Sequence, residues 1–212
     1  MRKPVLVVIS GPSGVGKTTI IKAVLARRKD LIFSVSCTTR PKRPGEVHGK
    51  DYFLITEEEF KGMIERGEFL EWATVHGHLY GTPRRFVEEA FNKGKSVLLD
   101  IDVQGALKVM ETFKDGVFIF VAPPSLEALK ERLKKRGTED QESIRRRLED
   151  ATWELKHIDK FQYLIVNEDL DEAIYDLDSI ITAEKIKVSR LEDDVKRYKE
   201  EVLESGGKEK GI

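Results

Sequence analysis

Cysteine is nearly absent from this 212-residue chain, which contains only Cys37. One cysteine cannot build an internal disulfide framework, so we expect a protein of the reducing cytoplasm. No apolar run approaches the ~18 residues of a membrane-spanning helix, and the N-terminus lacks the apolar stretch of a signal peptide. The net charge is only −1, so we expect neither a nucleic acid nor a membrane as a partner.

Histidine is also scarce. The chain has four, His48, His76, His78 and His157, and none has a cysteine or acidic partner at the spacing of a zinc ligand set. We therefore expect no zinc site. No arrangement of Ser, His and Asp indicates a covalent nucleophile either.

The most informative segment is residues 11–18, which read Gly-Pro-Ser-Gly-Val-Gly-Lys-Thr. They match the phosphate-binding pattern G-x-x-x-x-G-K-[ST] and stand between an apolar run, Val5–Ile9, and a helix-compatible stretch, Thr18–Arg28. In such a loop the N–H groups at the helix start face the phosphates, the lysine reaches the β- and γ-phosphates, and the threonine hydroxyl binds Mg²⁺. A glycine-rich surface loop would need neither the strand nor the Lys-Thr pair. The residues expected to bind a nucleoside triphosphate are Gly11, Pro12, Ser13, Gly14, Val15, Gly16, Lys17 and Thr18.

Further apolar runs alternate with helical segments along the chain. Val97–Ile101, Val117–Val121 and Tyr163–Val166 read as strands. Together with Val5–Ile9 they predict an α/β fold, in which helices cover both faces of a parallel sheet. Helix ends are marked by capping residues. The expected signals are a capping box at Thr56 and Glu59, an N-cap and N1 pair at Thr82 and Pro83 with Gly94 closing that helix, and Ser125 and Gly137 at the two ends of another.

One connection is too long for a simple crossover. Roughly 60 residues separate the first helix from the strand at Val97, and they include an Arg- and Pro-rich segment, 40–45, two strand-like pieces, Tyr52–Ile55 and Glu71–Val75, and a helix, Glu57–Arg66. We expect an inserted subdomain at the edge of the sheet where ligands bind. A second basic segment, 132–147, is expected to close over the site as a lid.

These motifs resemble the guanylate kinase family. The resemblance runs from about Pro4 to Glu184 and rests on the segments 34–52, 68–72, 79–81, 99–105, 122–125 and 165–167. It implies a P-loop NTPase fold with an inserted α+β GMP-binding subdomain and a helical lid. It further implies transfer of the γ-phosphoryl group of ATP to GMP or dGMP, giving ADP and GDP, with Mg²⁺. The implied division is a core of residues 1–33 and 96–183, an insertion of about 34–95, a lid of about 125–147 and an extension of 184–212.

The resemblance assigns the GMP phosphate to the Arg- and Pro-rich loop. Arg40 and Arg43 cannot lie inside a helix there, and two guanidinium groups suit a 5′-phosphate. Glu46, Tyr52 and Tyr80 join them by analogy with the family. Without the flanking pattern, a solvated basic loop would be the simpler reading.

The resemblance assigns recognition of the guanine base to Ser36, Glu71, Thr82 and Asp102. A carboxylate can accept the adjacent N1–H and N2–H₂ donors of guanine, and hydroxyl groups can donate to its O6. Adenine lacks those two donors, so it would leave the carboxylate unpaired. Taken alone, Glu71 could be an ordinary strand carboxylate, and Asp102 could cap the following helix or serve both purposes.

Asp100 ends an apolar strand at the edge where ligands bind, so with Thr18 it is expected to hold Mg²⁺. The resemblance makes Arg132, Arg136 and Arg147 lid arginines that act with Lys17 on the transferring phosphoryl group. Asn167 matches a family position near the donor adenine.

Three other functions fit these residues less well. A guanylate-kinase-like scaffold that binds peptides would show a degraded phosphate loop, and another small-molecule kinase would lack the set of Ser36, Glu71 and Asp102. A GTPase would carry an Asn-Lys-x-Asp signature. The oligomeric state is left open between a monomer and a homodimer.

The C-terminal segment carries an apolar stripe at heptad-like spacing, formed by Val188, Leu191, Val195, Tyr198 and Val202. We expect the last helix to run on to about Leu203 and to end at residues 205–207. The stripe could pack on the chain's own body, which we favour, or pair with another subunit.

Overall fold

The computed structural model describes residues 3–75, 77–135 and 141–206. Its central sheet has five strands in the order β2-β7-β1-β8-β9, and every neighbouring pair is parallel. The strands are β1 (Leu6–Ser10), β2 (Leu31–Phe33), β7 (Ser96–Asp100), β8 (Val117–Ala122) and β9 (Tyr163–Val166). The expected parallel α/β fold is therefore confirmed. The three-residue strand β2 is too short to show in the sequence pattern.

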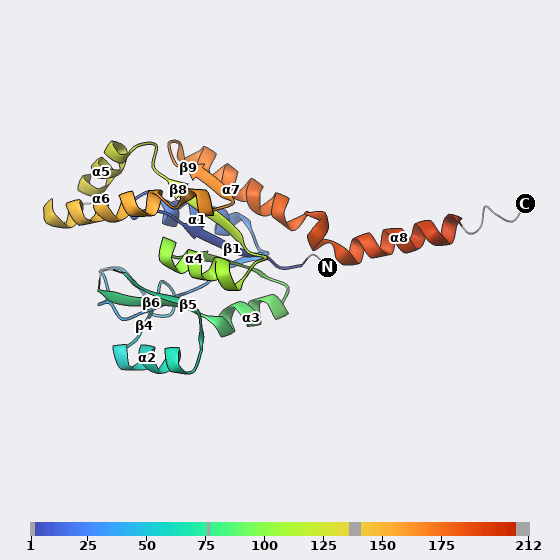
Figure 1. Cartoon of the computed structure of the whole chain (residues 1–212), viewed down its shortest axis with the longest axis horizontal. Helices are drawn as coiled ribbons and strands as arrows, with labels where there is room; N and C mark the ends of the chain where they lie inside the picture. The colour runs from blue at the N-terminus through green and yellow to red at the C-terminus, as the bar shows by residue number, and fades with distance from the viewer. Residues whose placement is uncertain (1–2, 76, 136–140, 207–212) are drawn as a thin grey trace, which may run out of the picture.

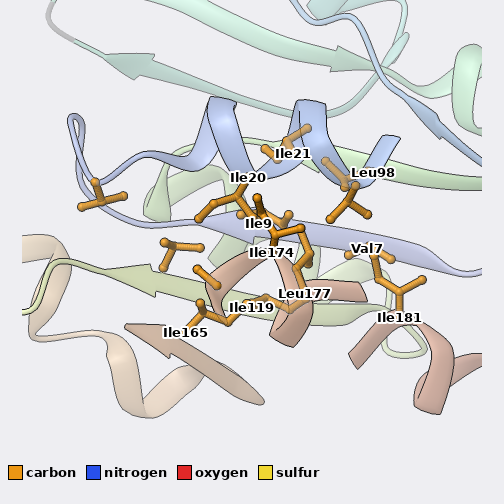
Figure 2. Packing of buried hydrophobic residues seen from close by; sticks show 14 of the residues in the cluster. Val7, Ile9, Ile20, Ile21, Leu98, Ile119, Ile165, Ile174, Leu177 and Ile181 are labelled. Atoms are coloured by element: carbon orange, nitrogen blue, oxygen red, sulfur yellow. The ribbon is translucent and has the colours of Figure 1, made fainter. Parts of the chain in front are cut away.

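Helices cover both faces of this sheet because its strands are apolar on both faces. On one side, Val7 and Ile9 of β1 pack against α1 (Lys17–Arg27) and α7 (Leu170–Lys185), as Figure 2 shows. On the other side, residues such as Leu6 and Val8 pack against α3 (Arg84–Asn92) and α4 (Val103–Thr112). The carboxyl ends of the strands stay clear of both layers, which leaves that edge for the site.

The insertion forms a second sheet with the order β4-β3-β6-β5. Its elements are β3 (Cys37–Thr38), β4 (Phe53–Leu54), α2 (Glu57–Glu65), β5 (Phe69–Val75) and β6 (His78–Pro83). A small core of its own holds it together, in which the rings of Phe60 and Phe69 stack at 4.4 Å. The expected capping box is present at the start of α2.

The capping prediction at Thr82 is wrong. Strand β6 continues through Pro83, which takes the N-cap position of α3, and the Thr82 hydroxyl donates to Glu71 on the neighbouring strand. Pairing with β5 outweighs the local capping preference here. Gly94 does follow this helix with a φ of 68°. Ser125 accepts from Ala128 N as a cap of the next helix, and Gly137 lies outside the described residues.

The lid consists of α5 (Leu126–Lys135) and α6 (Gln141–Leu155), which pack on each other. Leu129 and Leu133 of α5 share the main core with Val15 of the phosphate-binding loop. A short helix η1 (Ile158–Lys160) links α6 to β9. The lid is thus seated on the loop that it is expected to cover.

The C-terminal prediction is wrong in two respects. Helix α7 ends at Lys185, and a turn of 3₁₀ helix, η2 (Val188–Arg190), precedes α8 (Glu192–Gly206). Helix α8 leads away from the body (Figure 1), and Tyr198 and Val202 are 60% and 68% exposed, so the stripe does not pack on the chain itself.

A buried polar cluster explains the break. The Glu184 carboxylate, 1% exposed, accepts from Tyr163 Oη and is paired with Lys187 and Arg190. The contact with Arg190 needs the turn at residues 186–191, because in a continuous helix Arg190 would lie about 9 Å further along the axis than Glu184 and on another face. None of the helices in the described part of the chain is long and apolar enough to cross a membrane.

Candidate functional site

Residues 11–18 form the predicted loop between β1 and α1. Gly16 takes the N-cap position of α1 with a φ of 102°, and Gly11 has a φ of 132°. A Cβ at Gly11 would overlap the carbonyl oxygen of Val121 on the adjacent strand β8. The loop can follow this path because these positions are glycine. The first N–H groups of α1 are left at the carboxyl edge of the sheet.

Three side chains from later in the chain hold the loop. Asn167 Nδ2 donates to Val15 O at 2.6 Å, and Arg132 donates to Val15 O at 3.3 Å and to Asn167 O at 2.9 Å. Arg147 donates to Ser13 Oγ at 3.2 Å. Arg132 and Arg147 thus converge on the loop as the sequence predicted. Asn167 is buried and supports the loop, while its expected place near a donor adenine stays a prediction. Arg136 lies outside the described residues.

Lys17 lies beside the loop, and its charge acts on the carboxyls of Asp100, Asp102 and Glu154. Lys17 Nζ donates to the carbonyl oxygens of Gly11 and Pro12, the second at 3.2 Å. Burial raises the pKa of the Asp100 carboxyl at the end of β7, and the charge of Lys17 opposes that rise. Thr18 is exposed at the second residue of α1.

Glu154 is a site residue that the sequence analysis missed. Burial raises the pKa of its carboxyl to about 7, opposed by the charge of Lys17 and reinforced by the charges of Asp102 and Asp150. Glu154 follows Arg147 by seven residues on α6. That spacing is two helical turns, so both residues share the face that looks toward the loop, and this periodicity is the signal that could have found it.

The Arg- and Pro-rich loop forms an organised basic site. Arg40 is only 6% exposed, donates to Glu46 Oε2 at 2.8 Å, and lies 4.8 Å from the centre of the Tyr52 ring. Glu46 also accepts from the backbone N–H of Arg43 at 2.9 Å. Its hydrogen bond with Arg40 raises the pKa of that guanidinium and lowers the pKa of Glu46. Tyr80 meets the Tyr52 ring edge-on at 6.0 Å. Glu46 therefore orients the arginine.

A cavity of about 440 Å³ opens between this loop and α6. It is lined by Arg40, Pro41, Arg43, His78, Tyr80, Glu142, Ser143, Arg146 and Arg147. The insertion and the lid therefore face each other across one polar space. Of these residues, Pro41, His78, Glu142, Ser143 and Arg146 were not among the site residues predicted from the sequence.

The expected base-reading residues lie deeper. Glu71 is 6% exposed and its Oε1 accepts from Thr82 Oγ1 at 2.7 Å. Burial raises the pKa of Glu71 to about 7, and the nearby charge of Asp102 adds to the rise. Asp102 caps α4, accepting from Gly105 N at 2.7 Å, which confirms the capping alternative. Burial raises the pKa of Asp102 as well. Ser36 is buried on the same insertion.

Within residues 3–75, 77–135 and 141–206 no group of three or more His, Cys, Asp or Glu side chains has the arrangement of a metal site. The site combines an anion-binding loop, a second basic cavity facing it, and two carboxyls, buried Glu71 and half-buried Asp102. That combination suits transfer of a phosphoryl group between two nucleotides.

Comparison with known proteins identifies the family. The guanylate kinase family profile matches residues 2–184. The chain is 59% identical to a guanylate kinase of Thermotoga maritima over 93% of this chain and 95% of that protein. It is 52% identical to a guanylate kinase of Caldanaerobacter subterraneus subsp. tengcongensis over 94% of this chain and 97% of that protein. Its fold matches the crystal structure of guanylate kinase from Anaplasma phagocytophilum with a TM-score of 0.76, at 38% identity over 89% of this chain and 90% of that one. With a profile match over most of its length and relatives this similar, the chain belongs to the guanylate kinase family.

Proposed function

We propose that this chain transfers the γ-phosphoryl group of ATP to GMP, and to dGMP, and releases ADP and GDP. As a member of the guanylate kinase family it is a phosphotransferase of purine nucleotide metabolism. The observation that carries the proposal is a pair of carboxyls, buried Glu71 and half-buried Asp102, beside a complete phosphate-binding loop.

The donor side binds the triphosphate. The free N–H groups at the start of α1 donate to the phosphate oxygens, and Lys17 moves from the carbonyls of Gly11 and Pro12 to the β- and γ-phosphates. Arg132 and Arg147, already in contact with the loop, neutralise charge on the transferring group. Phosphoryl transfer asks the protein chiefly for positioning and charge stabilisation, which these cations supply.

The acceptor side binds the phosphate of GMP through Arg40 and Arg43. Glu46 holds the Arg40 guanidinium in one orientation, so a phosphate meets a preorganised donor. Burial raises the pKa of the Tyr52 hydroxyl to about 12, which keeps it protonated as a hydrogen-bond donor. Tyr80 lies beside it at the edge of the same cavity.

The base is read by Glu71 and Asp102, whose carboxylates accept from N1–H and the 2-amino group of guanine. Thr82 holds the Glu71 carboxylate in place by donating to one of its oxygens. The hydroxyl of Ser36 remains the proposed donor to O6 of guanine. AMP offers neither N1–H nor a 2-amino group, so it would leave a buried carboxylate unpaired.

Mg²⁺ fits the residues at the end of β7. A threonine hydroxyl and a carboxylate are the hard oxygen ligands that this ion takes, and Thr18 and Asp100 offer them beside the phosphate-binding loop. Held there with ATP, the ion would supply positive charge that offsets the charge of the phosphates.

We place the protein in the cytoplasm. Burial raises the pKa of the Cys37 thiol to about 11, so the single cysteine stays protonated and unreactive. A chain with one cysteine cannot form an internal disulfide, which agrees with a compartment where disulfides are not formed.

A panel of acceptors tests the proposed function. With ATP and Mg²⁺, GMP and dGMP should be phosphorylated at comparable rates, and kcat/KM for AMP should be lower by at least ~10³-fold. CMP, UMP and IMP complete the panel. Phosphorylation of AMP within about tenfold of GMP would overturn the assignment of Glu71 and Asp102 to the base.

A further inference from the structure

The two carboxylates that read the base come from different parts of the fold. Glu71 lies on β5 of the inserted sheet, whereas Asp102 caps α4, which packs on the core sheet. Their separation therefore depends on how the inserted sheet sits against α4. Helix α4 contacts β5 directly and lies between the core sheet and the insertion in Figure 1.

Gly105, in the first turn of α4, touches both acids. Its N–H donates to Asp102 Oδ1 at 2.7 Å. A Cβ at this position would stand 2.6 Å from Glu71 Oε2 and 3.2 Å from Glu71 Cδ, closer than a methyl group can approach. The Glu71 carboxylate therefore lies against the backbone of α4 only because residue 105 has no side chain.

Glu71 has little room to move away. Its other oxygen accepts from Thr82 Oγ1 at 2.7 Å, and the side chain is buried. The same Cβ at residue 105 would stay 3.6 Å from Asp102 Oδ1, an ordinary contact. A methyl group there would thus displace one carboxylate and leave the other in place.

Lys108, three residues further along α4, holds the next residue of β5. Its Nζ donates to Trp72 O at 2.6 Å and lies 4.7 Å from the centre of the Trp72 ring. Helix α4 therefore contacts β5 at two consecutive residues, Glu71 and Trp72. These contacts fix the position of the strand relative to the helix.

We propose that Gly105 is a specificity-determining positioning residue, which sets the separation of Glu71 and Asp102 to match the adjacent N1–H and 2-amino donors of guanine. This inference rests on the proposed function and adds to it the residue that aligns the two acids. Gly105 acts by its missing side chain and its N–H.

Gly105→Ala is the direct test. Alanine favours a helix more than glycine does, so α4 should still form. We expect the Kd of GMP, measured by calorimetry, to rise by about tenfold or more, and the preference for GMP over IMP, which lacks the 2-amino group, to fall by a similar factor. The Kd of ATP and kcat at saturating GMP should change by less than about threefold, because the donor side is untouched.

Gly62→Ala in α2 is the matched control. It is also a helical glycine, but a Cβ there would meet only the end of the Arg66 side chain. It should leave the binding of both nucleotides unchanged. A Gly105→Ala protein that keeps the GMP to IMP ratio of the wild type, or that loses ATP and GMP binding equally, would overturn the inference.

A double variant isolates the contact. Glu71→Asp shortens the acid by one methylene and clears the space that a Cβ at residue 105 needs. The double variant with Gly105→Ala should bind GMP at least about fivefold better than the product of the two single effects predicts. Additive effects, or a double variant that fails to fold, would overturn the inference.

The acceptor panel on the wild type tests the proposed function separately. If the wild type prefers GMP and only the Gly105 results fail, the proposed function stands.

Discussion

The donor and acceptor sides of the site are built in opposite ways. The donor loop is eight consecutive residues, 11–18, and presents mainly backbone N–H groups at the start of one helix. The acceptor side uses side chains from separate segments: Ser36 and Arg40 flank β3, Glu71 lies on β5 and Asp102 caps α4. In the function that we propose, backbone groups recognise phosphate, which all nucleoside triphosphates share, whereas the carboxyls of Glu71 and Asp102 distinguish one base from another. Changes on the donor side should therefore lower turnover, and changes on the acceptor side should lower affinity and selectivity.

The largest expected effect is on the donor side. Lys17→Ala should lower kcat by at least about 10³-fold, because it removes the cation aimed at the β- and γ-phosphates. The Kd of GMP from calorimetry should stay within about twofold of the wild type. An equal loss of GMP binding and turnover would show that the two sides are not separate.

Arg147 lies at the boundary of the comparison, since it contacts Ser13 of the loop and lines the cavity of the acceptor side. Arg147→Ala should lower kcat by about 10²–10³-fold with a smaller effect on KM, because charge on the transferring group is greatest in the transition state. Arg145→Ala is the control, since Arg145 is exposed on the same helix and only approaches Glu149 at 3.9 Å. A change confined to KM would reassign Arg147 to ground-state binding.

The acceptor side should respond through affinity. Glu71→Gln replaces an acceptor oxygen by an N–H₂ group facing the guanine donors, so the Kd of GMP should rise by about 10²-fold while that of ATP is unchanged. Titration calorimetry with each nucleotide separates the two. Equal weakening of ATP would contradict the division.

The acceptor side should show a pH-dependent affinity near neutrality. The pKa of Glu71 is raised to about 7, and GMP requires the ionised form. The Kd of GMP should therefore be nearly constant above pH 8 and rise by about tenfold between pH 8 and pH 6, because the ionised fraction falls from about nine-tenths to about one-tenth across a pKa of about 7. Glu71→Gln should flatten this profile. A wild-type profile that is already flat would show that the carboxyl ionises well below pH 6.

The smallest expected effect comes from α8, which touches neither side. Truncation after Leu191 removes α8 but keeps the cluster around Glu184, so turnover and melting temperature should change little. Arg190→Ala leaves α8 but removes the partner of buried Glu184 and of Asp115, and should cost about 2–4 kcal/mol of unfolding free energy. Chemical denaturation of both proteins checks this, and a truncation as costly as Arg190→Ala would mean that α8 packs on the body.

Features that depend on neighbouring residues were predictable from the sequence. The phosphate-binding loop, the capping box at Thr56 and Glu59, and the long buried strands follow from spacing and hydrophobic pattern alone. In each case the interaction that decides the conformation joins residues within about four positions or one apolar run. The family resemblance then supplied expected roles for residues that no local pattern could assign.

Features that depend on contacts between distant segments were not predictable. Thr82 looked like a helix cap but pairs across strands with Glu71, and the C-terminal stripe looked like a packing face but is turned away by the cluster at Glu184. Glu154 and Gly105 acquire their importance only where α6 meets the loop and α4 meets β5.

The amino-acid order thus specified which elements form and where phosphate binds, since those outcomes rest on local backbone geometry. Which carboxyls are buried, how far apart they lie and where the last helix points were decided by tertiary packing, because burial and close approach arise only when remote segments meet.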